Sequence, residues 1–234
     1  MDTWRHSAAA LTGDLRRIFA DRLRSLVAYG PSVEGEGDGL LTCLALVESL
    51  TVADLEACAR LAHHWERLGL AVPLIVPDPE FRRSLDVFPL EYAEILRAHE
   101  RLVGADPFDG VSIPAEDLRR ACETQVKSHL LHLREAFVES RGRPRAIADL
   151  VSSSAPAFAA LLRNVARLSG DASPARADAT RAGARVAGLP DGIVADVLAL
   201  DRTSTIPTTD AARLFPRYLA AVEQLARAVD SWRA

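Results

Sequence analysis

The sequence predicts an α+β protein in two parts, a small mixed sheet with helices packed on it and then an all-helical bundle. Up to about residue 112, short apolar runs typical of strands alternate with stretches of helical periodicity. Beyond Pro114 only the helical periodicity continues. We therefore expect an α/β domain at residues 1–112 and a helical bundle domain at residues 113–234.

The first domain is organised around residues 26–47, LVAYGPSVEGEGDGLLTCLALV. An apolar run ends at Tyr29-Gly30, an acidic loop rich in glycine follows, and a second apolar run covers residues 40–47. Two apolar runs separated by such a loop predict a strand, a turn and a second strand.

Helices and further strands are expected around this strand pair. Apolar residues at three- and four-residue steps predict a helix from Leu11 to Leu26 and a second one from Thr51 to Gly69. Strands are expected at residues 70–76 and at residues 87–92, VFPLEY, with one helical turn between them.

The second domain reads as helices alone. A long helix is expected from Pro114 to about Arg141, and the later helices at 145–151, 156–168, 174–187, 190–200 and 209–232. Pro156, Pro174 and Pro190 suit the first turns of helices. Residues 169–185 contain few large apolar side chains and are expected to form an exposed or mobile connector.

Composition excludes some classes of function. Acidic residues slightly outnumber basic ones and the net charge is -4, so the whole chain is not attracted to nucleic acid or anionic membranes. Cys43, Cys58 and Cys122 are widely spaced in apolar patterns and are expected to be buried free thiols. The charged N-terminal stretch predicts neither a signal peptide nor a membrane anchor, and we expect a cytoplasmic protein.

Residues 26–47 resemble the nucleotidyltransferase superfamily that includes DNA polymerase beta and the aminoglycoside nucleotidyltransferases. The hallmark of that superfamily is a strand, a Gly-Ser turn and a strand with an Asp-x-Asp pair. The likeness extends through residues 88–91, FPLE, and residues 99–104, HERLVG, which are similar to the segment that follows the sheet in relatives. It covers about half of the chain and implies a catalytic sheet followed by a helical bundle.

The resemblance implies a reaction in which two Mg²⁺ ions bind a nucleoside triphosphate and activate a hydroxyl. Two aspartates at alternate positions of a strand share one face and can bind these ions, and a neighbouring strand supplies a third carboxylate. In this chain Pro31 stands in place of the serine, and no residue from Leu40 to Val47 is acidic in any register. We therefore expect a degenerate, catalytically inactive site with no cofactor.

A few residues near the turn are candidates for relics of this chemistry. Gly30 and Ser32 form the candidate phosphate-binding turn. Glu36 and Asp38 are candidates for a displaced metal pair, but we favour the interpretation that they belong to a solvated, flexible glycine loop. Glu91, on the expected strand at residues 87–92, is the candidate third carboxylate, but we favour the interpretation that it is an ordinary strand-end acid paired to an arginine.

His129 and His132 lie three residues apart on the long helix, where two imidazoles can share a metal. The sequence offers no third ligand at a suitable spacing. We therefore do not expect a metal site at this pair.

Three functions fit these observations. The first is an inactive nucleotidyltransferase-like binding or interaction module, which takes a protein partner or a small ligand in a cleft between the domains beside Gly30. The second is an active transferase that uses Mg²⁺, a nucleotide and the relocated carboxylates Glu36, Asp38 and Glu91. The third is a structural homodimer formed through the apolar stripe of helix 209–232.

Overall fold

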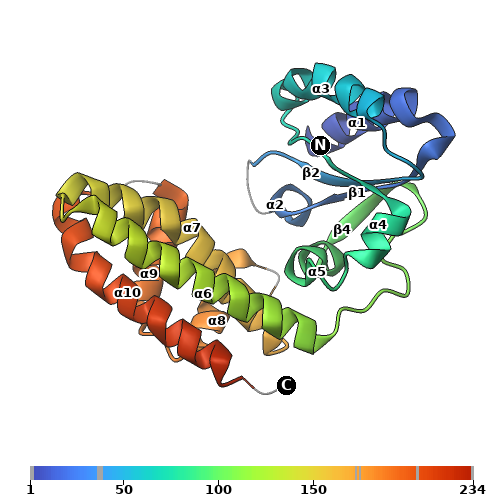
Figure 1. Ribbon diagram of the computed structural model, residues 1–234. Helices are drawn as coiled ribbons and strands as arrows, with labels where there is room; N and C mark the ends of the chain where they lie inside the picture. Colours follow the sequence, from blue (N-terminus) through green and yellow to red (C-terminus); the bar gives the residue numbers. More distant parts are fainter. Residues whose placement is uncertain (1–2, 36–38, 172, 174, 204–205, 233–234) are drawn as a thin grey trace. The chain divides into compact units, whose positions relative to one another are not determined.

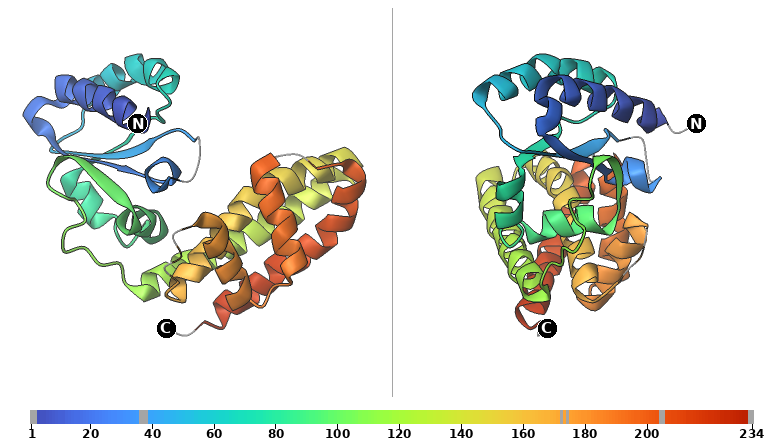
Figure 2. Two further views of the ribbon diagram at one scale, coloured as in Figure 1. Left: turned by 180° about the vertical axis from the view of Figure 1, so that it is seen from behind. Right: turned by 90° about the vertical axis from the view of Figure 1, so that its right-hand side faces the viewer.

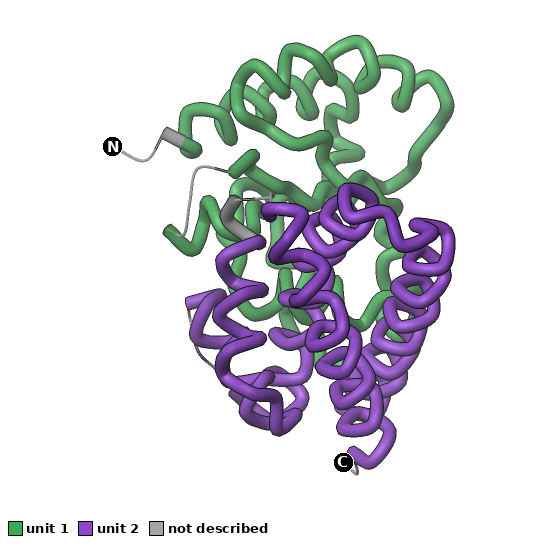
Figure 3. The backbone as a smooth tube through the Cα atoms, turned by 90° about the vertical axis from the view of Figure 1, so that its left-hand side faces the viewer, with its two compact units in different colours: residues 1–113 green, residues 114–234 purple. Residues whose placement is uncertain are grey.

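The computed structural model describes residues 3–35, 39–171, 173, 175–203 and 206–232 (Figure 1). The chain divides into two compact units, Met1–Ile113 and Pro114–Ala234 (Figure 3). The first unit is a sheet with helices and the second is entirely helical in its described residues, which confirms the α+β class.

The first unit is built on a mixed sheet with the strand order β3-β2-β1-β4. Its strands are β1 (Leu23–Tyr29), β2 (Thr42–Val47), β3 (Leu74–Pro77) and β4 (His99–Gly104). β1 is antiparallel to both β2 and β4, whereas β3 runs parallel to β2. Since a parallel pair needs a crossover connection, the helix α3 (Val52–Arg67) lies between β2 and β3 in the chain.

One face of the sheet is covered by α1 (Thr3–Phe19) and α3 (Figure 1, Figure 2). The core on this face contains Leu11, Leu15 and Phe19 of α1, Trp65 of α3, and Leu26, Ala28, Cys43, Ala45 and Val47 of the strands. The buried Trp65 Nε1 donates a hydrogen bond of 2.8 Å to Asp14 Oδ2, so this polar ring atom has a partner.

The opposite face is covered by α4 (Asp78–Arg83) and α5 (Pro89–Arg97) (Figure 1). Its core contains Val27, Leu44, Leu46, Val76, Phe81, Tyr92, Ile95 and Phe108. The ring of Phe81 meets the rings of Tyr92 and Phe108 edge to face, at centroid distances of 5.0 and 5.4 Å. We call this side of the sheet the α5 face and the other side the α1 face.

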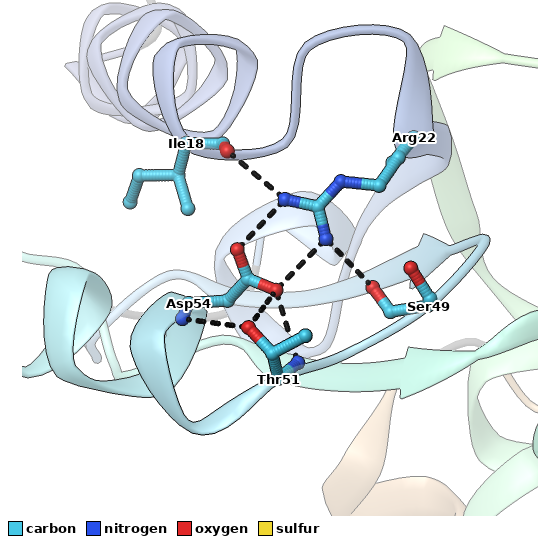
Figure 4. A network of polar contacts seen from close by, with 5 residues as sticks. All are labelled: Ile18, Arg22, Ser49, Thr51 and Asp54. Atoms are coloured by element: carbon cyan, nitrogen blue, oxygen red, sulfur yellow. Dashed lines mark hydrogen bonds and ion pairs between the residues drawn. The ribbon is translucent and has the colours of Figure 1, made fainter.

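A polar clamp joins the 3₁₀ turn Ala20–Arg22, which precedes β1, to the start of α3 (Figure 4). Thr51 and Asp54 form a capping box, in which each side chain accepts from the other residue's backbone N–H. The Arg22 guanidinium donates to both carboxylate oxygens of Asp54, at 2.8 and 2.7 Å, and to the Ser49 carbonyl. The hydrogen bond from Arg22 lowers the pKa of Asp54 well below its usual value.

The strand predicted at residues 87–92 is wrong, because this stretch enters the helix α5 and the remaining strand is β4. Pro89 occupies the first turn of α5, where its fixed φ and missing N–H are compatible with a helix. Leu90 and Ile95 then turn towards the core. The strand predicted at 70–76 is shorter and shifted, since β3 begins at Leu74 and Leu70 only forms an isolated bridge to Leu41.

The helical unit contains α6 (Ala115–Ser140), α7 (Pro144–Leu168), α8 (Arg176–Val186), α9 (Asp191–Thr203) and α10 (Thr208–Asp230). α7 is its central helix and packs on the other four. Among the described helices α7 alone is long and apolar enough to cross a membrane, by length and composition only. Its packing within the bundle gives another reason for this apolar composition.

Two predictions for this unit are wrong. Pro156 lies inside α7 and does not separate two helices. Ala155, Phe158 and Ala159 around it are fully buried, so tertiary packing outweighs the lost backbone hydrogen bond. The connector expected up to residue 185 is in large part the helix α8, whose small residues Thr180, Ala182, Gly183 and Ala184 are buried.

We predict that Gly183→Ala destabilises the protein by about 1 to 3 kcal/mol, a typical cost of overpacking. A Cβ at this position would lie 1.8 Å from the Leu162 carbonyl oxygen, because α8 packs closely on α7. Urea unfolding measures the change. Gly13→Ala in α1 is the control, since a Cβ there meets nothing within 4 Å and the change gains about 1 kcal/mol of helix propensity.

We also predict a pH signature for the clamp. Because the pKa of Asp54 is lowered in the folded state, its ionised form adds stability above its unfolded pKa of about 3.9. That contribution is lost as the pH falls towards the folded pKa. Asp54→Asn should therefore lower the free energy of unfolding at pH 7 and have a shrinking effect below about pH 4, unlike the exposed control Glu56→Gln on α3.

Candidate functional site

The turn after β1 requires glycine for its backbone geometry. Gly30 has φ 84° and ψ -168°, a region that is essentially open to glycine only. A Cβ there would lie 2.9 Å from Thr42 Oγ1 on the neighbouring strand. The Gly30 carbonyl accepts from the N–H groups of Val33 and Glu34, which closes the single helical turn α2 (Pro31–Glu34).

Two groups that a phosphate-binding turn would use, the N–H of residue 31 and the Ser32 hydroxyl, are missing or already engaged in this turn. Pro31, at the first position of α2, has no N–H to offer. The Ser32 hydroxyl already donates to the Gly39 carbonyl, at 3.0 Å. The Ser32 hydroxyl therefore holds its own loop, and the phosphate-binding role of Gly30 and Ser32 stays a prediction.

The strand β2, where the resemblance places the metal pair, is apolar on both faces. Thr42, Leu44 and Leu46 face α5, whereas Cys43, Ala45 and Val47 face α1. Thr42 donates its hydroxyl to the Tyr29 carbonyl at 2.7 Å, and Leu44 is only 1% exposed. On the other face, burial raises the pKa of the Cys43 thiol to about 12. Neither face presents a pair of oxygen ligands for Mg²⁺.

The other strands do not replace the missing carboxylates. Glu100 on β4 is the only acidic residue in the four strands of the sheet that the structure describes. It lies opposite Ala28, on the α1 face, and forms an ion pair with Arg5 of α1. No described strand therefore places a carboxylate on the α5 face, where Thr42 and Leu44 lie.

The predicted metal candidates do not form a site in the described structure. Glu36 and Asp38 lie outside the described residues. Glu91 is an exposed residue in the first turn of α5, so the prediction that it sits on a strand is wrong. An acidic side chain in the first turn stabilises a helix through the macrodipole, which is sufficient reason for its position.

The structure instead gathers carboxylates around Arg97, at the end of α5. Arg97 forms an ion pair with Glu34 of α2 and lies 3.9 Å from Glu94 Oε1. The Glu34 side chain is only 7% exposed, and its Oε2 is the one buried side-chain oxygen without a hydrogen-bond partner in the described part of the chain. From the sequence, Glu34 is only one of several acids in the glycine-rich loop. Nothing in the local pattern indicates that its partner lies 63 residues away.

A second polar pair lies at the start of β4. His99 Nε2 is 3.1 Å from both carboxylate oxygens of Asp106, and His99 Nδ1 is 2.8 Å from the Ile95 carbonyl. Burial raises the pKa of Asp106, but the hydrogen bonds from Phe108 N and His99 outweigh it, and the pKa lies below its usual value. Both ring nitrogens of His99 are therefore engaged within the fold.

In the described residues no group of three or more His, Cys, Asp and Glu side chains is placed to hold a metal ion. His129 Nε2 lies 3.1 Å from the Tyr218 hydroxyl, and burial lowers the pKa of His129. His132 is exposed beside Glu135. The two histidines thus have separate surroundings.

The apolar stripe of α10, which the third of the sequence-based functions assigns to a homodimer, packs inside the helical unit. Its buried members on α10 are Leu214, Phe215, Tyr218, Val222, Leu225 and Val229. α10 packs on α6 and α7, and Phe215 stacks on Phe137 of α6 with ring centroids 4.2 Å apart. This stripe is therefore core and not an open surface.

The fold of this chain is similar to that of a protein whose structure has been solved. The spectinomycin adenyltransferase AAD(9) from Enterococcus faecialis, solved with ATP and spectinomycin, matches it with a TM-score of 0.62. The match covers 97% of this chain and 99% of that one, at 14% sequence identity. The chain has a nucleotidyltransferase-like fold.

The comparison confirms the fold that residues 26–47 indicated. No protein-family model matches the chain, and no curated protein matches its sequence. At 14% identity the likeness shows the fold alone. The functional argument therefore depends on the residues of the turn and the sheet.

We predict that Gly30→Ala destabilises the protein by roughly 1 to 3 kcal/mol, because alanine would be strained at this φ and ψ and would crowd Thr42. Chemical unfolding of the variant checks this. Ser32→Ala in the same turn is the matched control, since it removes one exposed hydrogen bond and should change stability by less than about 0.5 kcal/mol. Equal effects of the two changes would contradict the geometric role of Gly30.

Proposed function

We propose that this chain is a nucleotidyltransferase-like protein that does not transfer nucleotides and acts as a binding or interaction module. The observation that carries the proposal is the composition of the α5 face. Its β2 positions are Thr42, Leu44 and Leu46, and Glu100, the one strand carboxylate, points to the α1 face. Without carboxylates at the metal position, the triphosphate has no Mg²⁺ ions to orient it and neutralise its charge.

The free-energy cost of burying a carboxylate also supports the proposal that the chain does not transfer nucleotides. Leu44 packs in an apolar cluster with Phe81 and Val76, so the metal position is occupied by core. A carboxylate placed there would lose its hydration without gaining a compensating partner. Filling this position with an aliphatic side chain favours stability of the sheet and removes the ligands that catalysis requires.

The carboxylates that do lie near the turn have other partners. Glu34 and Glu94 share the positive charge of Arg97, and Asp106 binds His99 and the Phe108 N–H. A divalent ion would have to compete with these built-in cations and donors for the same oxygens. These ion pairs and hydrogen bonds support the proposal of a binding module, because they give the acidic groups a structural role in place of metal binding.

The experiment is a transfer assay combined with calorimetric titration. The purified chain with Mg²⁺ and each of ATP, GTP, CTP and UTP is expected to release no pyrophosphate above the rate in buffer. Titration with the same nucleotides, with and without Mg²⁺, is expected to show no dependence of binding on the metal. Mg²⁺-dependent pyrophosphate release by the purified chain would overturn the proposal.

The alternative of relocated carboxylates has one observation in its favour, the buried Glu34 Oε2 that lacks a partner. Under that alternative, Glu34→Gln and Asp38→Asn would each abolish Mg²⁺-dependent turnover. Glu56→Gln, an exposed change on α3, is the control for removal of one negative charge. Turnover that survives both changes would exclude Glu34 and Asp38 as ligands.

A further inference from the structure

A groove between α8 and α9 lies entirely within the helical unit and has a volume of about 840 Å³. This is within the range of small-molecule sites, about 300 to 1,000 Å³. Residues one and two turns apart line it from each helix: Asp178, Arg181 and Arg185 from α8, and Asp191, Val194 and Leu198 from α9. One face of each helix therefore forms the groove.

The charged residues of the groove are only partly neutralised by one another. Arg181 donates to Asp178 at 2.8 Å, so these two form an ion pair. Arg185 and Asp191 make no ion pair and no side-chain hydrogen bond with any described residue. The groove thus offers one guanidinium and one carboxylate, on opposite helices, with unused hydrogen-bonding capacity.

Arg185 and Asp191 lie at helix ends, and this position explains why one is basic and the other acidic. It does not explain why a groove lies beside them. Arg185 lies in the last turn of α8 and Asp191 in the first turn of α9, where each favours the helix macrodipole. That interaction does not require an adjacent concave surface. The lining of the groove also contains apolar side chains, the buried Ala184 and Val194 and the half-buried Leu198.

We infer that this groove binds a small zwitterion with an apolar side chain, the chemistry of a free hydrophobic amino acid. The ligand's carboxylate accepts from the Arg185 guanidinium, whose planar fork matches a carboxylate. Its ammonium group donates to the Asp191 carboxylate. The apolar side chain rests on Val194 and Leu198, which removes apolar surface from water.

Calorimetric titration of the full chain with L-leucine tests the inference. Saturable binding by the wild type is expected, and Arg185→Gln and Asp191→Asn should each weaken it about tenfold or more, as for the loss of a charge-assisted hydrogen bond. Arg145→Gln, an exposed change on α7, is the control and should leave binding unchanged. Circular dichroism confirms that each variant is folded.

Two analogues test the separate charges. N-acetyl-leucine lacks the ammonium group and leucinamide lacks the carboxylate, so each should bind more weakly than leucine to the wild type. The inference is overturned if leucine shows no saturable heat at millimolar concentration, or if either groove variant binds leucine as tightly as the wild type. The groove lies outside the α/β unit, so this result is independent of whether the chain transfers nucleotides.

Discussion

Burial of the β1 and β2 pair on both faces is the constraint on which the rest of the α/β unit depends. Leu26, Val27 and Ala28 are fully buried, and every residue from Cys43 to Val47 is buried. Such strands must be apolar at consecutive positions, because side chains alternate between two covered faces. The α1 and α3 layer and the α4 and α5 layer exist as stable elements because this double-sided sheet gives each an apolar surface to cover.

The same constraint moves acidic side chains away from the strands. An ionised group between two packed layers is costly unless it has partners, and the two central strands of the sheet, β1 and β2, contain no carboxylate along their described length. Glu34 is on the turn helix, Glu94 on α5 and Asp106 in the loop after β4. Arg97 lies beside Glu34 and Glu94, and His99 lies beside Asp106, so each of these carboxylates has a partner within the unit.

The strand pair, its turn and the change to a helical bundle could be predicted from sequence because they rest on local apolar patterns. β4 could not, since it is an edge strand with no fully buried residue, in which Glu100 is partly buried and Arg101 is exposed. For α8 the sequence contains two conflicting indications, a helix at 174–187 and a connector at 169–185, because its small side chains carry little hydrophobic signal although they allow the close packing at Gly183. The Arg97 cluster depends on contacts between segments far apart in the chain, which periodicity does not reveal.

The backbone geometry at Gly30 requires glycine whether or not the turn binds a phosphate. Its positive φ lets the chain leave β1 and form the turn of α2, and its missing Cβ leaves room for Thr42 Oγ1, which binds the Tyr29 carbonyl. Both requirements arise within the strand pair and would hold with no phosphate present. A glycine at this point is therefore evidence for the nucleotidyltransferase-like frame, whereas evidence for catalysis must come from strand carboxylates, and β2 supplies none.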